Sequence, residues 1–277
     1  MGSFWEWWQY LPAKMDPVIF TIGSFQLRWY GTMYIVAFAV TYILTQYRVK
    51  DEDLEYSQEV IENFFMYAII GVLVGGRLGY VLFYNFGYYL LHPLEIILPV
   101  RFGNGVEFTG ISGMSYHGGV IGVILAFVYV SKKHNLNFFR FTDLVAPAIP
   151  LGYMFGRIGN FINGELYGRV TDVSWGMYFP LDPTGQLRHP SQLYEAFFEG
   201  LFLFAILWII RKRTPFQGFL PGLYLIGYGV VRFFIEFYRM PDEHLGLVFL
   251  GMTAGQILCL AMIAGGVVFW RLAKRAD

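Results

Sequence analysis

Long runs of apolar residues without charge dominate this sequence and restrict its fold more than any other feature. A helix needs about 20 mostly apolar residues to cross the hydrocarbon layer of a membrane. The first candidate, residues 29–47, contains no charged side chain. Further candidates lie at about 63–84, 117–131, 143–158, 192–210, 219–238 and 247–270. The sequence therefore predicts an all-α integral membrane protein with about seven transmembrane helices.

Composition agrees with this reading, because only 14% of the 277 residues are charged and 56% are hydrophobic. Soluble domains are about a quarter charged. The formal net charge is zero, so nothing points to nucleic acid as a partner. Pro147 and Pro150 break the fourth candidate span. Residues 88–100 are too interrupted to span, since they contain His92, Pro93, Glu95 and Pro99, and we interpret them as an interfacial segment.

Lys and Arg in the connections predict the orientation, because these residues stay preferentially on the cytoplasmic side. The connections 48–60, 132–142 and 211–219 and the tail 271–277 hold eleven of them, whereas 1–28, 85–116, 159–191 and 239–246 hold six in a longer total length. We expect the N-terminus outside, the C-terminus in the cytoplasm, and external loops at about 85–116 and 159–191. No cleavable signal, repeat or soluble domain is recognisable, so residues 1–277 are expected to form one polytopic membrane domain.

Three arginines remain inside the predicted spans: Arg77, Arg157 and Arg232. A charge at mid-bilayer costs from about 3 to more than 10 kcal/mol, so such residues normally face a polar interior. Arg232 shares a helical face with Tyr228, Glu236 and Arg239, one or two turns away. This spacing favours either an anion site or an ion-pair ladder that only stabilises the fold.

The fourth span ends in a segment, residues 156–169, that is punctuated by glycines and dense in polar groups. Arg157 and Asn160 lie three residues apart and can point into one cavity, and glycines let a ligand approach the backbone. A plain glycine turn does not require Arg, Asn and Glu at a membrane boundary. His117 opens the third span between Tyr116 and Gly118, where it is either a general base or a satisfied interfacial residue.

Five blocks of residues, which follow one another along nearly the whole chain, resemble the prolipoprotein diacylglyceryl transferase family. The resemblance rests on Arg28-Trp29-Tyr30-Gly31, on Tyr116-His117-Gly118-Gly119, on the fourteen residues 156–169, on His189-Pro190-Ser191-Gln192-Leu193-Tyr194-Glu195 and on Arg232-Phe233-Phe234-Ile235-Glu236-Phe237-Tyr238-Arg239. The 156–169 block is far more specific than a short glycine motif.

The resemblance implies an enzyme of the bacterial cytoplasmic (inner) membrane that needs no metal or organic cofactor. Its donor is phosphatidylglycerol, and its acceptor is the lipobox cysteine in the signal peptide of a preprolipoprotein. The products are a thioether-linked diacylglyceryl group and glycerol phosphate, in the first step of lipoprotein maturation. The implied catalytic residues are His117, Arg157 and Arg232, and the substrate-binding positions are Arg157, Tyr30, Asn160, Glu165, Gly168, Tyr228, Glu236 and Arg239.

This chemistry gives the residues physical roles. A free thiol has a pKa near 8.5 and is only partly ionised at neutral pH, so a base such as His117 would increase the fraction of the acceptor cysteine that is present as thiolate. Negative charge grows on the leaving phosphate, and planar guanidinium groups such as those of Arg157 and Arg232 meet it with paired hydrogen bonds. Whether His117 removes the proton or orients the headgroup stays open.

The sequence also contains features of two other functions and one other nucleophile. Ser112 and His117 would suit an intramembrane serine protease, but they are only five residues apart in sequence, outside the usual arrangement on separate helices. A transporter would also need buried charge, but Pro147 and Pro150 have no counterpart in the other half of the chain. The single cysteine, Cys259, lies in an apolar run, where we expect it to be inert.

Overall fold

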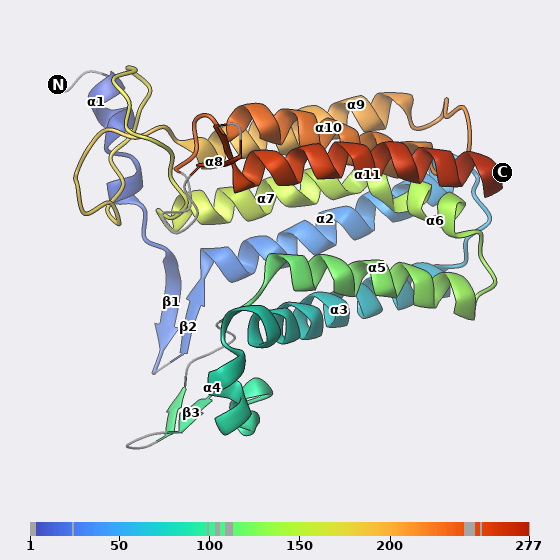
Figure 1. The fold of residues 1–277 in the computed structure, drawn as a ribbon, viewed down its shortest axis with the longest axis horizontal. Coiled ribbons are helices and arrows are strands. Elements are labelled where there is room, and N and C mark those ends of the chain that lie inside the picture. Colours follow the sequence, from blue (N-terminus) through green and yellow to red (C-terminus); the bar gives the residue numbers. More distant parts are fainter. Residues whose placement is uncertain are drawn as a thin grey trace. The chain divides into compact units, whose positions relative to one another are not determined.

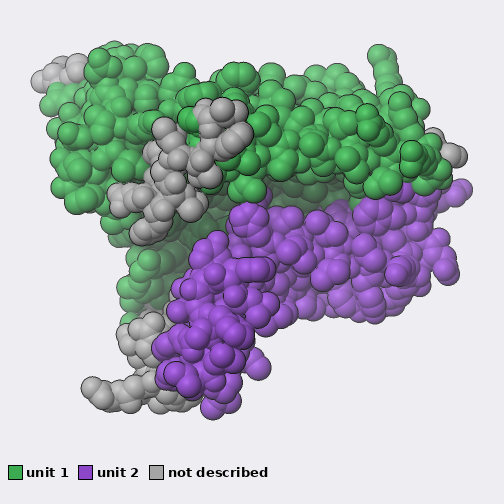
Figure 2. All heavy atoms as spheres, in the orientation of Figure 1, with its two compact units in different colours: residues 1–53, 142–277 green, residues 54–141 purple. Residues whose placement is uncertain are grey.

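The computed structural model describes residues 4–23, 25–98, 100–102, 106–108, 113–240, 247–249 and 251–276. The described chain is mostly helical, which confirms the helical membrane fold class. It forms two compact units, residues 1–53 with 142–277 and residues 54–141, which Figure 2 colours separately. That residues 1–277 act as one domain stays a prediction.

Helices that lie side by side build the first unit (Figure 1). α2 packs against α7, α7 packs against the helix that starts at Ser191, and α10 packs against α11. α8, η4 and α9 form one continuous helix, in which η4 is a π-helical segment. The bounds are α2 (Trp29–Asp51), α7 (Ile149–Ile162), α8 (Ser191–Tyr194), η4 (Glu195–Phe202), α9 (Leu203–Ile210), α10 (Phe219–Ile235) and α11 (Ala254–Ala276).

Prolines interrupt the helical path into α7, as the sequence predicts. α6 (Phe138–Val145) leads into η3 (Ala146–Ala148), a single 3-10 turn that contains Pro147. Pro150 stands in the first turn of α7, where its missing N–H has no helical acceptor to lose. The fourth candidate span is therefore two helices joined by a turn.

Short elements and one long loop complete the first unit. They are α1 (Phe4–Gln9), η1 (Pro12–Lys14), the hairpin of β1 (Val18–Ile22) with β2 (Phe25–Arg28), and the hairpin of β5 (Leu247–Phe249) with β6 (Met252–Thr253). The loop between α7 and α8 has its own small core of Phe161, Met177 and Phe179, onto which Trp8 packs. It is therefore folded onto the end of α7.

An arginine and an aspartate fix this loop. Arg188 is buried, and its Nε and Nη2 donate to the two Asp182 oxygens at 2.7 and 3.0 Å. Burial alone would raise the pKa of Asp182, but hydrogen bonds from Arg188 and Thr184 lower it to about 2. The pair is therefore ionised across the physiological pH range.

The second unit is a pair of long helices with a small extension. Its elements are α3 (Gln58–Tyr84), α4 (Phe86–Leu91), η2 (Pro93–Ile96), β3 (Val100–Phe102), β4 (Val106–Phe108) and α5 (Tyr116–Lys133). Glycines set the contact of α3 with α5: a Cβ on Gly122 would lie 1.9 Å from the Gly71 oxygen, and one on Gly118 would lie 2.1 Å from the Gly75 oxygen. Such close backbone contact through small residues is typical of helix pairs in membranes.

Three helices in the described chain are long and apolar enough to cross a membrane: Gln58–Tyr84, Ser191–Ile210 and Ala254–Ala276. Phe219–Ile235 is a shorter apolar helix. Helices also form in the other predicted spans, with a 3-10 turn inside the fourth, but the count of seven spans and the orientation stay predictions. In residues 88–98 only short helices form, so the prediction that this stretch is no spanning helix is confirmed.

Two predicted boundaries were wrong. α2 continues past residue 47 and buries Arg48, for which the sequence predicts a connection, because Glu52 neutralises its guanidinium group at 2.7 Å. Residues 247–249 and 252–253 form a hairpin rather than the start of the last span. Gly251 turns this hairpin at φ +74°, and Thr253 Oγ1 then accepts from the backbone N–H of Gln256 at the start of α11.

Candidate active site in the first unit

Charged side chains gather where α7, η4 and α10 face one another within the first unit. α7 contributes Tyr153, Arg157 and Asn160, whose spacing of four and three residues puts them on one face. η4 contributes two carboxylates, Glu195 and Glu199, whose side chains are both 0% exposed. Arg232 lies in the last turn of α10, and Glu236 and Arg239 follow that helix. We give the name arginine cluster to Tyr153, Arg157, Glu195, Glu199, Tyr228, Arg232, Glu236 and Arg239.

Glu195 is the centre of the cluster, because it contacts all three arginines. Its Oε2 lies 2.8 Å from Arg157 Nε and 3.2 Å from Arg232 Nη1. Its Oε1 accepts a hydrogen bond from Arg239 Nη1 at 2.9 Å. The arginines are only 15% exposed, so these pairs form in a poorly solvated environment where they are strong.

Arg232 bridges the other two carboxylates. Its Nη1 lies 3.5 Å from Glu199 Oε1, and its Nη2 lies 3.3 Å from Glu236 Oε2. Nevertheless Arg232 Nη1, Glu199 Oε1 and Glu236 Oε2 are buried without a hydrogen-bond partner among the described residues. Buried polar atoms of this kind cost about 1–3 kcal/mol each unless a partner satisfies them. The cluster therefore has donor and acceptor capacity for a polar ligand.

A tyrosine connects the arginine of α7 to the carboxylates. Tyr153 Oη accepts from Arg157 Nε at 2.6 Å and donates to Glu199. It also lies 3.4 Å from the hydroxyl of Tyr228 on α10, and the two rings meet edge to face. These contacts restrict the rotamer of Arg157, so its guanidinium group is held in place rather than free to reorient.

A second polar group continues from Arg157 towards the loop. Arg157 Nη1 donates to Asn160 Oδ1 at 3.3 Å, and Asn160 Nδ2 donates to Glu165 Oε1 at 2.8 Å. Tyr30 on α2 forms a side-chain hydrogen bond with Asn160. Its ring packs closely against Gly159, where an added Cβ would lie 3.3 Å from the ring. The first turn of α2 and the last turns of α7 thus contribute to one polar region.

Buried side chains of α8 hold the turn that presents Glu165. Gln192 Nε2 donates to the Glu165 carbonyl at 2.6 Å, and Ser191 Oγ donates to the Leu166 carbonyl at 3.0 Å. Leu166 has φ +59°, a conformation that is costly for a bulky residue. Such strain persists only where the surroundings impose it.

Gly168 lies where two backbone segments meet. Its N–H donates to the His189 carbonyl at 2.8 Å, and it forms a β-bridge with Arg239. A Cβ at this position would lie 2.4 Å from the Tyr238 carbonyl oxygen. Arg169 Nε also donates to the Arg239 carbonyl at 2.8 Å. The glycine is therefore required for the loop to dock against the segment that carries Arg239.

Comparison with known proteins identifies the family of this chain. A family model described as "Prolipoprotein diacylglyceryl transferase" matches residues 17–272. The chain belongs to the prolipoprotein diacylglyceryl transferase family. The "Phosphatidylglycerol--prolipoprotein diacylglyceryl transferase" of Chlorobaculum tepidum is 57% identical over 282 residues, which cover 100% of this chain and 98% of that protein. The protein of the same name from Bordetella avium is 47% identical over 95% of this chain and 96% of its own length. That of Wolinella succinogenes is also 47% identical, over 97% of both chains.

The family membership agrees with the resemblance inferred from sequence blocks, and most of the expected site residues lie together in the first unit. Arg157, Arg232, Tyr228, Glu236 and Arg239 belong to the arginine cluster, and the polar region beside it contains Asn160, Glu165 and Tyr30.

His117 belongs to the second unit, where it is exposed in the first turn of α5. Arg77 of α3 donates instead to the carbonyls of Glu95 and Ile96, which ties η2 to α3. The roles of all these residues stay predictions.

The sequence assigns no site role to three members of the cluster: Tyr153, Glu199 and Glu195, the last residue of the 189–195 block. Both glutamates lie inside the predicted span 192–210, and a buried arginine needs a buried counter-ion. A search for acids inside spans would therefore have found them. Tyr153 has a weaker signal, its position one turn before Arg157.

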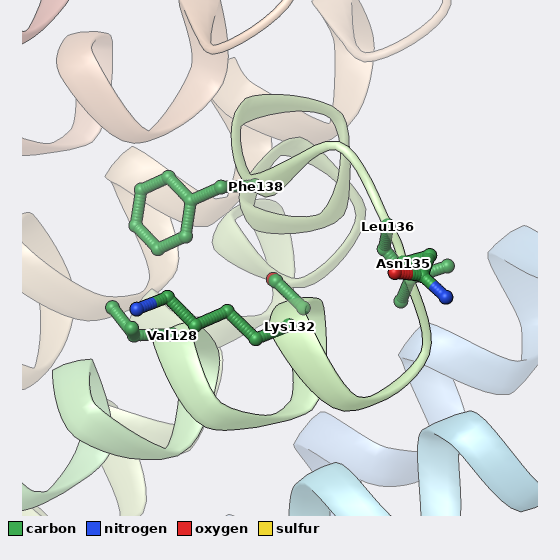
Figure 3. A pocket seen from close by; sticks show the side chains of 6 residues that line it. Val128, Lys132, Asn135, Leu136 and Phe138 are labelled. Atoms are coloured by element: carbon green, nitrogen blue, oxygen red, sulfur yellow. The ribbon is translucent and has the colours of Figure 1, made fainter.

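The sequence offers two further candidate nucleophiles, Ser112 and Cys259, and the structure contains a pocket in the second unit. Ser112 lies outside the described residues, and Cys259 is buried in α11. A pocket at the turn between α5 and α6 is lined by Val128, Ser131, Lys132, Asn135, Leu136 and Phe138, and Figure 3 shows the Lys132 side chain lying along it. None of its lining residues belongs to the predicted site.

Proposed function

We propose that this protein transfers the diacylglyceryl group of phosphatidylglycerol to the thiol of the lipobox cysteine of a preprolipoprotein. The observation that carries the proposal is the cluster of three partly buried arginines in a chain that matches its family over residues 17–272. In this reaction the cysteine sulfur attacks the glyceryl carbon next to the phosphate. A C–S bond forms, the C–O bond to phosphate breaks, and glycerol phosphate leaves with the electron pair.

Arg157 and Arg232 bind the phosphate in this proposal. The diester carries one negative charge, and a second develops as the C–O bond breaks, so the guanidinium groups stabilise the transition state more than the ground state. Arg232 Nη1 lies 3.2 and 3.5 Å from Glu195 and Glu199 but makes no hydrogen bond among the described residues, which supports this role, because a phosphate oxygen could accept one. Tyr30, Asn160, Glu165 and Gly168 form the substrate-binding surroundings.

His117 is the proposed acceptor of the thiol proton. Its imidazole is exposed, and the Ser115 side chain caps the first turn of α5 by accepting from the Gly118 N–H at 3.3 Å. An exposed imidazole is accessible to a substrate thiol, and imidazole nitrogens are common proton acceptors in catalysis.

The membrane placement completes the proposal. The chain spans the bacterial cytoplasmic membrane about seven times as one polytopic domain, with the N-terminus and the loops at about 85–116 and 159–191 outside and the C-terminus inside. The distribution of Lys and Arg supports this orientation. The exposed apolar side chains of α4 and η2, such as Leu91 at 79% and Leu94 at 64%, support an interfacial position for residues 88–98.

The experiment is a transfer assay with the purified full chain. Phosphatidylglycerol and a lipobox peptide with one cysteine should yield a peptide heavier by one diacylglyceryl group, together with glycerol phosphate. A peptide with serine in place of that cysteine should give no product. Release of free diacylglycerol, without modification of the cysteine peptide, would contradict the proposal.

A further inference from the structure

Neither the sequence motifs nor the proposed phosphate site gives Glu195 a role, although it lies at the centre of the arginine cluster. Its side chain is fully buried, and it contacts one arginine from α7 and two from the α10 segment. Burying a carboxylate costs several kcal/mol, which these pairs repay only with good geometry. Two of its contacts are short, 2.8 Å to Arg157 and 2.9 Å to Arg239.

Electrostatics explains why a carboxylate is needed at this point. Three guanidinium groups that converge on one region repel one another strongly where solvent is scarce. Glu195 accepts from both sides, through Oε2 towards Arg157 and Arg232 and through Oε1 towards Arg239. It therefore fixes the spacing between the arginine of α7 and those of α10. Its position in a π-helical segment also fits a functional site, since such segments are frequent there.

The geometry points to Glu195 as a positioning residue for the transfer reaction, one that aligns Arg157, Arg232 and Arg239 on the substrate phosphate without touching the reacting atoms. This inference rests on the proposed function. It predicts that loss of the carboxylate charge still leaves three arginines to attract an anionic lipid, but no longer in the arrangement that stabilises the growing phosphate charge. The turnover number should fall, and the Michaelis constant for phosphatidylglycerol should not rise.

The first unit supplies a matched control. Glu52 is also a poorly exposed carboxylate bound to two arginines, at 2.7 Å from Arg48 Nε and 3.1 Å from Arg211 Nε. It follows the last turn of α2, whereas Tyr30 lies in the first turn of the same helix; at 1.5 Å per residue the two are about 33 Å apart. Glu52→Gln therefore makes the same chemical change in a similar ion-pair network away from the arginine cluster.

The test compares Glu195→Gln, Glu195→Asp and Glu52→Gln in the full chain, with kcat, KM for phosphatidylglycerol and melting temperature measured for each. We expect Glu195→Gln to lose tenfold or more in kcat with KM unchanged or lower. Glu52→Gln should keep kcat within about twofold once the folded fraction is counted, even if it melts lower. Glu195→Asp keeps the charge on a shorter side chain and should lie between Glu195→Gln and the wild type in kcat.

A Glu195→Gln enzyme with wild-type kcat per folded molecule would overturn the inference, as would a raised KM with kcat unchanged. If Glu195→Gln does not fold, Glu195→Asp decides, and an unchanged kcat in that variant also overturns it. Either result would leave the proposed function standing as long as the wild-type protein transfers the diacylglyceryl group. Failure of the wild type would instead refute the proposed function itself.

Discussion

Arg157 on α7 and Glu195 on η4 form a buried ion pair, with 2.8 Å between Nε and Oε2. The carboxylate is fully buried, so removal of the arginine would leave a charge without its nearest partner, which typically costs about 3–5 kcal/mol. Arg157, which we propose binds the phosphate, is thus held in place by the protein itself. Such preorganisation lowers the cost of arranging donors during the reaction.

Gly168→Ala should disturb the site through the backbone. The added Cβ would lie 2.4 Å from the Tyr238 oxygen and 2.8 Å from the His189 Cβ, so the segment carrying Arg239 must move. We expect a loss of about 1–3 kcal/mol in unfolding free energy and a lower transfer rate. Gly265→Ala in α11 is the control, because no atom lies within 4 Å of its added Cβ. Equal stability of the two variants would argue against the close contact at Gly168.

His117→Gln should abolish transfer at neutral pH, because glutamine cannot accept the thiol proton, while phosphatidylglycerol binding stays measurable. The variant should also fold normally, since the side chain is exposed. Transfer is measured across pH 6–9, where thiolate forms by itself at the upper end. A variant that keeps most of its rate at neutral pH would show that His117 is not the base.

Asp182→Asn should lower the melting temperature at neutral pH, because buried Arg188 loses its ionic partner. The pKa of Asp182 is about 2 in the folded protein, below about 3.9 in an unfolded chain. Its stabilising effect is therefore complete above about pH 4 and is lost as the pH falls towards 2. Between pH 5 and 8 the melting temperature of Asp182→Asn should differ from that of the wild type by a constant amount. The control Asp172→Asn changes an exposed side chain and should melt close to the wild type. A difference that disappears between pH 8 and 5 would contradict this assignment.

The topology prediction needs cysteines on opposite ends of the bundle. Leu181 is 61% exposed in the loop after α7, and Lys274 is exposed near the end of α11. Leu181→Cys and Lys274→Cys, each with buried Cys259 replaced by alanine, should react with an impermeant thiol reagent from opposite sides of the membrane. Labelling from the same side would refute the proposed orientation.

Hydropathy predicted the helical segments, because helices in lipid must satisfy their own backbone and cover it with apolar side chains. It could not predict how far a helix continues once charges pair. Arg48 ended the apolar run but is buried against Glu52 in the structure. Hydropathy also cannot distinguish a short apolar strand from a helix, so it predicts a helix where β5 and β6 form a hairpin.

The site was predictable in part, for a related reason. An arginine inside a span is conspicuous, so Arg157 and Arg232 were identified from sequence. Of the acids that neutralise them, Glu236 is also predicted from the sequence, whereas Glu195 and Glu199 are not assigned a role, because the surrounding run stays apolar enough to span a membrane. Which acid meets which arginine depends on how α7, η4 and α10 pack, and one sequence does not contain that information.

Replacing the two arginines by lysine tests the central claim most directly. A lysine keeps the charge but offers a point charge where the phosphate requires a two-pronged donor. Single-turnover transfer by Arg157→Lys and Arg232→Lys should each be slower by about tenfold or more, which corresponds to roughly 1.4 kcal/mol of transition-state stabilisation. Melting temperatures of the lysine and alanine variants, measured alongside, separate rate from folding. A wild-type rate in folded Arg157→Lys and Arg232→Lys would contradict the account and leave the arginine cluster as an ion-pair network that only stabilises the fold.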